Sequence, residues 1–275
     1  MPRARRPVVQ WLARAGYAAR GLVFVILGCF TAVAALDAHA RPVDGKDALR
    51  TVLAQPFGSV LLLMLAAGLL CFALWREAQC ILDADRLGSD LKGMARRTVY
   101  GAAGLFYVAF AAVSLSMLIG VHTPNSERAV HDWTGWLLTQ PFGRLAIGAI
   151  GVIVVVTGLC IGVAGVRAQF RKRLDLKTKP RRLVTALGVA GYLTRSAVTC
   201  LIGLFLGFAA LHGNAHEATG LAGALMVVKS QSYGRALLAV TALGLLAFGA
   251  YGLAEALFRR IEGQSLTSAP AWMSV

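Results

Sequence analysis

Three arginines stand at repeated positions close to the start of long apolar stretches. Arg20, Arg96 and Arg195 are each followed eight residues later by a glycine. If the stretches pack as equivalent units, three guanidinium groups converge at one end of a bundle. There they would bind a lipid phosphate or a small anion through bidentate hydrogen bonds. The alternative is that each arginine extends separately to lipid headgroups. The spacing alone leaves both interpretations open.

All five histidines fall on one predicted side of the membrane. They are His39, His122, His131, His212 and His216. His212 and His216 are four residues apart, as two ligands on one helical face would be, so they are the candidate ligands for Zn²⁺ or Cu²⁺. Gly213 and Asn214 between them favour a loop instead, and we predict no metal site.

Signatures of catalysis and of cofactor binding are absent from the sequence. It contains no Gly-x-Ser-x-Gly, no His-Glu-x-x-His, no phosphate-binding loop and no Cys-x-x-Cys pair. The central parts of the apolar stretches contain no Asp, Glu, Lys or His, which argues against an ion-coupled pump. We therefore predict no catalytic residues and no cofactor, and we favour a protein that is not an enzyme.

The elements that position these residues follow from the composition. Of 275 residues, 57% are hydrophobic and 15% are charged, with a mean hydropathy of +0.65. This polar fraction is too small to coat a water-soluble domain. Six uncharged stretches are long enough to predict membrane-spanning helices. They are Gly21–Leu36, Thr51–Trp75, Thr98–Val121, Leu145–Val166, Ser196–Leu211 and Ala236–Ala254. The sequence thus predicts an all-α integral membrane protein.

Two of the stretches are too short unless they extend past a charge. The first and the fifth hold sixteen residues, about 24 Å of helix, against a hydrocarbon core of about 30 Å. Both are preceded by helix-compatible apolar sequence, so we expect Arg20 and Arg195 to lie inside longer helices, with side chains that extend to the membrane interface. Gly45–Ala54 and Val130–Thr139 are expected to form short interfacial helices. In the first of these, Leu49, Val52 and Leu53 would face lipid.

Basic residues gather on the side of the membrane that holds both termini. That side has 21 of the 28 Lys and Arg residues, including the segment Arg167–Arg182. The positive-inside rule therefore predicts that both termini lie in the cytoplasm. Attraction to anionic headgroups on the cytoplasmic face accounts for the net charge of +15, so no nucleic acid partner is predicted.

A four-residue motif opens each even span. Its copies are Gln55-Pro56-Phe57-Gly58, Gln140-Pro141-Phe142-Gly143 and Gln231-Ser232-Tyr233-Gly234. Pro suits the first turn of a helix, and an aromatic ring suits the membrane interface, so the motif is interpreted as structural. Together with the arginines it defines three repeats, each a helical hairpin of two spans, at about 8–78, 91–170 and 183–260, in a single membrane domain spanning 1–275. Because each unit crosses twice, the repeats are parallel, and pseudo-threefold packing is expected.

These residues resemble those of the bacterial domain-of-unknown-function 1206 family. The resemblance covers nearly the whole chain and implies three two-helix membrane repeats, with no activity attached. The third copy departs from the pattern at Ser232 and Tyr233. The second copy lacks the Gly-Tyr pair found at Gly16-Tyr17 and Gly191-Tyr192.

The functional hypothesis from the sequence, together with the resemblance, is a non-enzymatic integral protein of a bacterial plasma membrane. It would act as a scaffold, or as a component that interacts with lipids or a membrane partner. A transporter or channel for a small anion or apolar solute along the repeat axis is the second hypothesis, and a lipid-modifying enzyme is the third. Gly158 and Gly162, like Gly203 and Gly207, form Gly-x-x-x-Gly pairs. Such pairs suit close helix packing within the chain or in a homo-oligomer.

Overall fold

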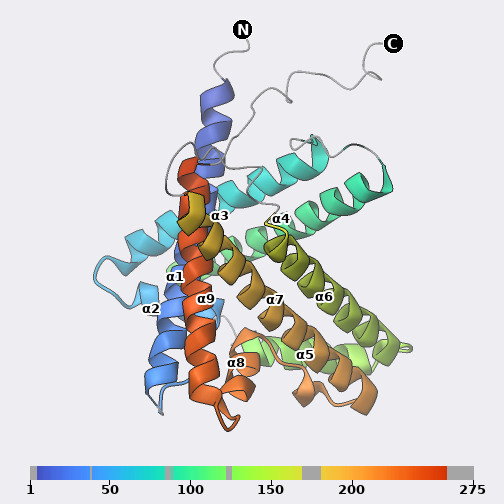
Figure 1. Cartoon of the computed structure of the whole chain (residues 1–275). Helices are drawn as coiled ribbons and strands as arrows, with labels where there is room; N and C mark the ends of the chain where they lie inside the picture. Colours follow the sequence, from blue (N-terminus) through green and yellow to red (C-terminus); the bar gives the residue numbers. More distant parts are fainter. Residues whose placement is uncertain are drawn as a thin grey trace.

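A computed structural model describes residues 5–37, 39–83, 88, 90–121, 126–168 and 181–258. Within these residues the chain is helical, and six helices are long and apolar enough to cross a membrane. They are α1 (Arg5–Leu36), α3 (Gly58–Ile81), α4 (Leu91–Leu118), α6 (Gly143–Val166), α7 (Arg181–His212) and α9 (Gly234–Phe258). Helix α1 begins and α9 ends at the same end of the bundle (Figure 1). The predicted number of spans is confirmed.

The first and fifth spans are longer than their uncharged cores. Helices α1 and α7 each contain 32 residues, and Arg20 and Arg195 lie inside them. The expected extension past these arginines is therefore confirmed. Most of the basic segment Arg167–Arg182 lies outside the described residues, so its predicted position in the cytoplasm stays a prediction.

A short helix precedes each even span. These are α2 (Gly45–Leu53), α5 (Ser126–Leu138) and α8 (Leu221–Lys229), with a 3-10 turn at Ala215–Glu217 before α8. The first two were expected, whereas the sequence had given no signal for α8. One expectation about α2 is wrong: Leu49 does not face lipid but is 2% exposed, in the core formed with α1, α3 and α4.

The four-residue motif forms the same turn in all three repeats. The amide of Gly58 donates to the carbonyl of Gln55 at 2.8 Å, and Gly143 and Gly234 bond to Gln140 and Gln231 at 2.9 and 2.8 Å. The glycine is required by a close backbone approach. A Cβ at Gly58, Gly143 or Gly234 would lie within 2.2 Å of the carbonyl oxygen of Leu53, Leu137 or Lys229. The turn therefore folds each short helix back onto the start of a long one.

The departure in the third copy changes the backbone of this turn. Phe57 and Phe142 take left-handed conformations, with φ of 60° and 68°, whereas Tyr233 does not. Left-handed φ at the third position, with Pro at the second, is typical of a type II turn. With Ser232 in place of Pro, the third turn keeps its hydrogen bond without that strained residue.

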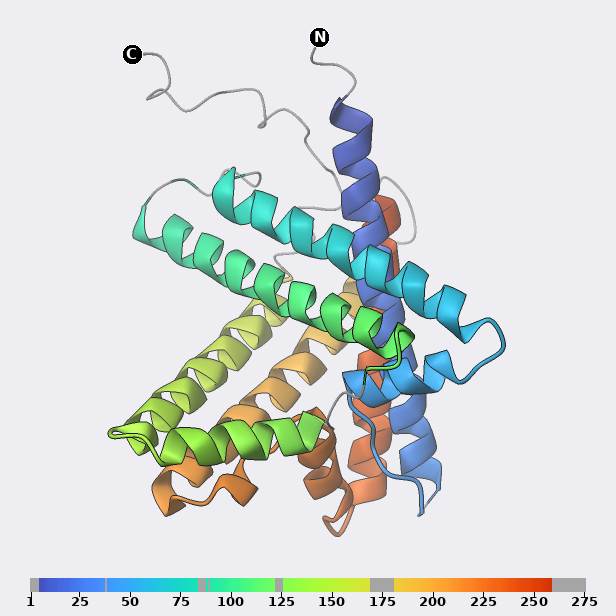
Figure 2. The same ribbon diagram turned by 180° about the vertical axis from the view of Figure 1, so that it is seen from behind.

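The closest packing joins helices of different repeats. Helix α3 packs along α4, α6 along α7, and α9 along α1, so each even span lies against the next odd span in a cyclic order. Figures 1 and 2 show α3 beside α4, α6 beside α7 and α9 beside α1. Glycines allow the close approach: Gly158 and Gly162 of α6 face Ser196 and Cys200 of α7. This pair of glycines therefore packs inside the chain, on the helix that the sequence places next.

The pseudo-threefold arrangement is incomplete in the second repeat. Helices α1 and α3 pack together, as do α7 and α9, whereas α4 and α6 make hardly any contact. Gly16 and Gly191 lie so close to the backbones of Phe72 and Phe248 that a Cβ would be 2.5 Å from either Cα atom. In the second repeat Gly104 takes the place that Gly21 has in the first. The residue that corresponds to Gly16 is therefore Val99, which lies five residues before Gly104 and is 56% exposed. The missing Gly-Tyr pair thus explains why this repeat stays open.

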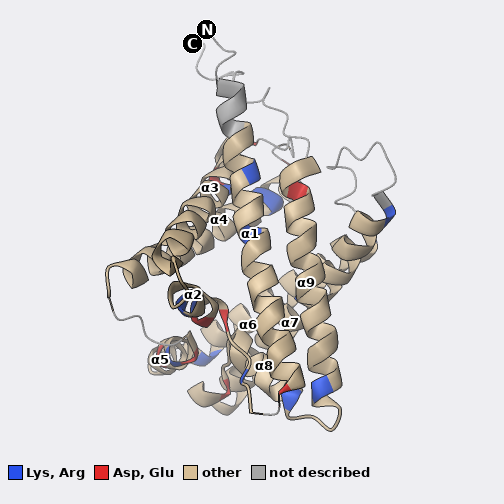
Figure 3. Ribbon diagram, turned by 90° about the vertical axis from the view of Figure 1, so that its left-hand side faces the viewer, with Lys and Arg blue, Asp and Glu red and all other residues tan. Residues whose placement is uncertain are grey.

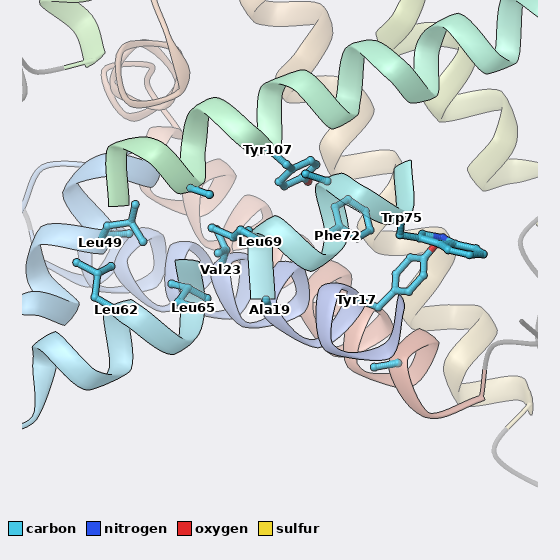
Figure 4. Close-up of a cluster of buried hydrophobic side chains, with 14 of the residues drawn as sticks. Tyr17, Ala19, Val23, Leu49, Leu62, Leu65, Leu69, Phe72, Trp75 and Tyr107 are labelled. Carbon is cyan, nitrogen blue, oxygen red and sulfur yellow. The ribbon is translucent and has the colours of Figure 1, made fainter. Parts of the chain in front are cut away.

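The main core lies where α1, α3 and α4 meet. Aromatic side chains gather at one end of this cluster and leucines at the other (Figure 4). Phe72 makes edge-to-face contacts with Tyr17 and Tyr107, with ring centroids 5.2 and 4.7 Å apart. The indole nitrogen of Trp75 donates to the hydroxyl of Tyr17 at 3.3 Å. The guanidinium groups of Arg20 and Arg76 lie against the rings of Tyr17 and Phe72 in this group.

Helix α8 is capped by a residue of the preceding repeat. The carboxylate of Glu127 on α5 accepts hydrogen bonds from the amides of Gly220 and Gly223 at 3.2 and 2.8 Å, and Gly220 provides no side-chain cap. Losing such a cap costs about 1 kcal/mol. We expect Glu127→Ala to accelerate amide hydrogen exchange in the first turn of α8 by about fivefold. Unchanged exchange would show that the cap contributes nothing, and Glu217→Ala is the control.

Candidate functional site

Arg20 is buried inside the bundle. It is 3% exposed and its Nη2 lies 2.5 Å from Oε2 of Glu255 on α9, whose side chain is 5% exposed. The guanidinium also faces the rings of Tyr17, Phe72 and Phe248 at 5.1 to 5.2 Å. The expectation that Arg20 extends to lipid headgroups is wrong, because an ion pair and aromatic faces hold it inside the bundle.

The close packing of α1 and α9 brings the two charges together. A Cβ on Gly21 would lie 2.9 Å from the carbonyl of Gly249 and 2.9 Å from the amide of Leu253. Because the two backbones approach so closely at this point, the neighbouring Arg20 reaches Glu255 across the seam. A buried charge without a partner would be strongly unfavourable, so the pair must form as the helices dock.

Arg195 lies beside Arg20 but has no acidic partner. Its guanidinium carbon is 5.7 Å from the ring of Phe24 and 5.2 Å from that of Phe248, the same ring that Arg20 faces. Among the residues that the structure describes, its guanidinium makes no hydrogen bond or ion pair. The residue as a whole is partly exposed. Arg195 is thus a cation held by aromatic faces, without an acidic partner among the described residues.

A third arginine joins the group from the first repeat. Arg76 on α3 faces Phe72 and Tyr100 at 4.9 and 4.8 Å, and its Nη1 donates to Oε1 of Gln79 at 2.9 Å. Arg20 and Arg76 both lie close enough to repel the charge of Arg195. We call the residues Arg20, Arg76, Gln79, Arg195 and Glu255 the arginine layer.

Arg96 does not belong to the layer. It is exposed on α4, and the residue that occupies the place of Arg20 in the second repeat is Ala103. Gly104, next to Ala103, lies against the side chain of Glu77, and Gly21 lies against the backbone of Leu253. Glu77 and Leu253 are each 19 residues past the glycine that opens their helix. Two of the three predicted arginines, Arg20 and Arg195, therefore lie together. The third arginine of the layer is Arg76 and not Arg96.

The layer lies at a defined depth along the even spans. Gln79 and Glu255 each follow the opening glycine of their helix by 21 residues, which is about 31 Å of helix. The hydrocarbon core of a bilayer is about 30 Å thick. A helix that starts at one membrane surface therefore brings the layer close to the other surface. In Figure 3 charges gather near this end of α1 and α9 and again around α2 and α8.

Charge is balanced differently in the three helix pairs. In the pair α9 and α1, Glu255 faces Arg20. The same two places hold Gln79 and Ala103 in α3 and α4, so neither charge is present there. In α6 and α7 the place of Glu255 is taken by Ala164, which also follows the opening glycine of its helix by 21 residues. The place of Arg20 is taken by Arg195. One pair therefore has the cation without the acid.

Among the described residues, His131, His212 and His216 lie at the end of the bundle opposite to the arginine layer, and the candidate ligands His212 and His216 have different partners. His212 Nδ1 is 2.6 Å from Oε2 of Glu217, whereas the ring of His216 packs edge-on against that of His131, with centroids 5.2 Å apart. No cluster of three possible metal ligands occurs among the described residues. His39 is exposed, and His122 lies outside the described part of the chain.

A groove of about 680 Å³ lies between α1 and α3, and the side chains of Val52 and Leu253 complete its lining. Small and apolar side chains line it: Ala15, Ala18, Ala19, Leu22, Ile26, Leu61, Met64, Leu65, Ala67, Gly68 and Cys71. Without a charged side chain in its lining, this groove suits lipid hydrocarbon and is separate from the arginine layer.

The acidic and amide members of the layer, Glu255 and Gln79, were not predicted from the sequence. Glu255 stands one residue past the uncharged stretch that ends at Ala254, and Gln79 lies four residues past Trp75. A signal was present, since both stand 21 residues after an opening glycine. Comparison of the even spans in that register would have identified them as equivalent positions.

Comparisons with known proteins agree with the three-repeat architecture. The family described as Domain of Unknown Function (DUF1206) matches residues 15–83, 98–168 and 190–259. An uncharacterized protein of Bacillus subtilis (strain 168), YxxB, is 28% identical over 259 residues, covering 93% of each chain. No solved structure matches the chain. The three matched segments contain the paired helices described above, and the chain is a multi-pass membrane protein that belongs to the DUF1206 family.

Proposed function

We propose that the protein is a non-enzymatic component of a bacterial plasma membrane that binds anionic lipids at the arginine layer. The observation that carries this proposal is the guanidinium of Arg195, which faces two aromatic rings and has no acidic partner among the described residues. Three arginines and one glutamate leave the layer with excess positive charge. Ionisable groups within membrane helices mark functional sites more often than not.

The depth of the layer favours a lipid phosphate as the anion. With both termini in the cytoplasm, as the distribution of basic residues predicts, the layer lies near the headgroups of the cytoplasmic leaflet. Guanidinium groups bind phosphate with two parallel hydrogen bonds, and this leaflet is rich in anionic lipids. The lipid tail would remain in the bilayer beside the helices, so binding would not require a path from water.

Transport of a small anion along the repeat axis is the second candidate, and the arginines that meet near the axis favour it. The packing argues for binding rather than conduction, because the rings of Tyr17, Phe72, Tyr107 and Phe248 fill the space where the helix pairs converge. A lipid-modifying enzyme is the weakest candidate. The described histidines lie at the end opposite to the arginines that would hold a lipid phosphate.

Binding of short-chain lipids to the full-length protein in detergent tests the proposal. We expect phosphatidylglycerol to bind more tightly than phosphatidylcholine, and Arg195→Gln to weaken that binding about tenfold to a hundredfold. This corresponds to the loss of a charge-assisted hydrogen-bonded pair of about 1.5 to 3 kcal/mol.

Arg96→Gln is the matched control, because Arg96 is an exposed arginine outside the layer. It should leave the dissociation constant within about twofold, since an exposed charge contributes little. Equal affinity for both lipids, or equal losses in the two variants, would contradict the proposal.

A further inference from the structure

We infer that the bound phosphate group occupies the place beside Ala164 of α6 that the Glu255 carboxylate fills in the equivalent pair of helices. This inference rests on the proposed function and specifies where the ligand lies. Arg20 and Arg195 are equivalent arginines, each three residues after a tyrosine that follows a glycine. Only Arg20 has a carboxylate from the chain itself.

The two helix pairs share the same register. A Cβ on Gly28 of α1 would lie 2.8 Å from the amide nitrogen of Leu246, and one on Gly203 of α7 would lie 2.8 Å from that of Val155. Leu246 and Val155 both stand 12 residues after the glycine that opens their helix. The position facing Arg195 that corresponds to Glu255 is therefore Ala164.

The two places differ in access as well as in charge. Arg20 and Glu255 are 3% and 4% exposed, so their pair is closed to ligands. Ala164 and Arg195 are both partly exposed. The methyl side chain of Ala164 offers no carboxylate to Arg195, and a phosphate oxygen is a suitable acceptor for the Arg195 guanidinium.

The surroundings of Ala164 suit an amphiphilic anion rather than a free ion. Val163 and Val166 on α6 are 48% and 68% exposed, and Arg167 at the end of the helix is exposed. Arg167 follows Ala164 by three residues, so it lies on the same side of the helix and adds positive charge there. Exposed apolar side chains beside a cationic place match a lipid, whose phosphate and tail meet at the membrane surface.

The third helix pair provides an internal comparison. At the equivalent positions α3 and α4 carry Gln79 and Ala103, and the buried Gln79 accepts a hydrogen bond from Arg76 of its own helix. Because α4 has Ala103 where α7 has Arg195, the pair of α3 and α4 has no unpaired cation at this place and needs no external anion. A single lipid phosphate per chain is the expected stoichiometry.

Supplying the missing carboxylate tests the inference. In the full-length protein, Ala164→Glu should pair internally with Arg195 and weaken phosphatidylglycerol binding about tenfold or more. Ala164→Gln has nearly the same size without the charge and should keep the affinity within about threefold. Without lipid, Ala164→Glu should melt at a higher temperature than Ala164→Gln, which shows that the variant folds and forms the pair.

The outcomes separate this inference from the proposed function. If Arg195→Gln loses phosphatidylglycerol binding while Ala164→Glu binds as the natural protein does, the lipid site stands and its placement beside Ala164 is overturned. Equal losses in Ala164→Glu and Ala164→Gln would also overturn the placement, because size rather than charge would be responsible. If inorganic phosphate binds as tightly as the lipid and competes with it, the ligand is a free anion. If the natural protein does not distinguish phosphatidylglycerol from phosphatidylcholine, the proposed function fails.

Discussion

Replacing Glu255 with alanine is expected to lower the free energy of unfolding by about 3 to 5 kcal/mol. The substitution leaves Arg20 buried, 3% exposed, against the rings of Tyr17, Phe72 and Phe248 but without its carboxylate. Aromatic faces offset only part of the cost of an unpaired buried cation. Thermal or denaturant unfolding of the full-length protein in detergent measures the loss.

Two further variants make this prediction specific to the ion pair. Arg20→Leu combined with Glu255→Leu removes both charges and should recover most of the lost stability, because apolar side chains of similar size can replace a buried pair. Glu217→Ala breaks the more exposed contact with His212 and should cost no more than about 1 kcal/mol. Similar losses for Glu255→Ala and Glu217→Ala would show that burial of the Arg20 pair is energetically unimportant.

Gly143→Ala should be almost as damaging, with an expected loss of about 3 kcal/mol. A Cβ at this position would lie only 1.8 Å from the carbonyl oxygen of Leu137, well inside van der Waals contact. The obstacle is a backbone atom of the turn, so no side-chain rotation can relieve it. Either the hydrogen bond from Gly143 to Gln140 breaks or α5 moves away from α6. The melting temperature of the full-length protein in detergent measures the effect.

Gly207→Ala is the matched control for this substitution. Gly207 also lies in a long helix, α7, but a Cβ there would meet no atom within 4 Å. Alanine should be neutral or should stabilise α7 by about 0.5 to 1 kcal/mol through its helix propensity. If both variants lost the same stability, the close approach in the turn would not be the cause.

The eight-residue spacing from arginine to glycine shows where inference from the sequence succeeded and where it failed. It correctly related Arg20 to Arg195, and the structure brings both to the ring of Phe248. It wrongly included Arg96, because Gly104 is the equivalent of Gly21 and not of Gly28. A spacing between two common residue types matches by chance, whereas packing contacts define equivalence directly.

The pairing of helices was also beyond the sequence pattern. Each repeat was expected to be a hairpin, yet the most extensive packing joins α3 to α4, α6 to α7 and α9 to α1. Apolar periodicity predicts that a helix will be buried or will face lipid, but it does not identify the neighbour. The neighbour depends on which small residues lie opposite one another, as Gly21 does with Gly249.

The six spans, the three repeats and the position of the motif before each even span follow from the sequence, although Pro56 and Pro141 lie in a turn before the helix and not in its first turn as expected. These features follow from local requirements: about 20 apolar residues to cross a bilayer, and a glycine where two backbone segments nearly touch. Only the packing of the helices determined that Glu255 neutralises Arg20, whereas Arg195 lies against Phe24 and Phe248 without an acidic partner among the described residues. Electrostatic pairing acts across helices distant in the chain, and its outcome depends on their register and depth of burial rather than on local composition.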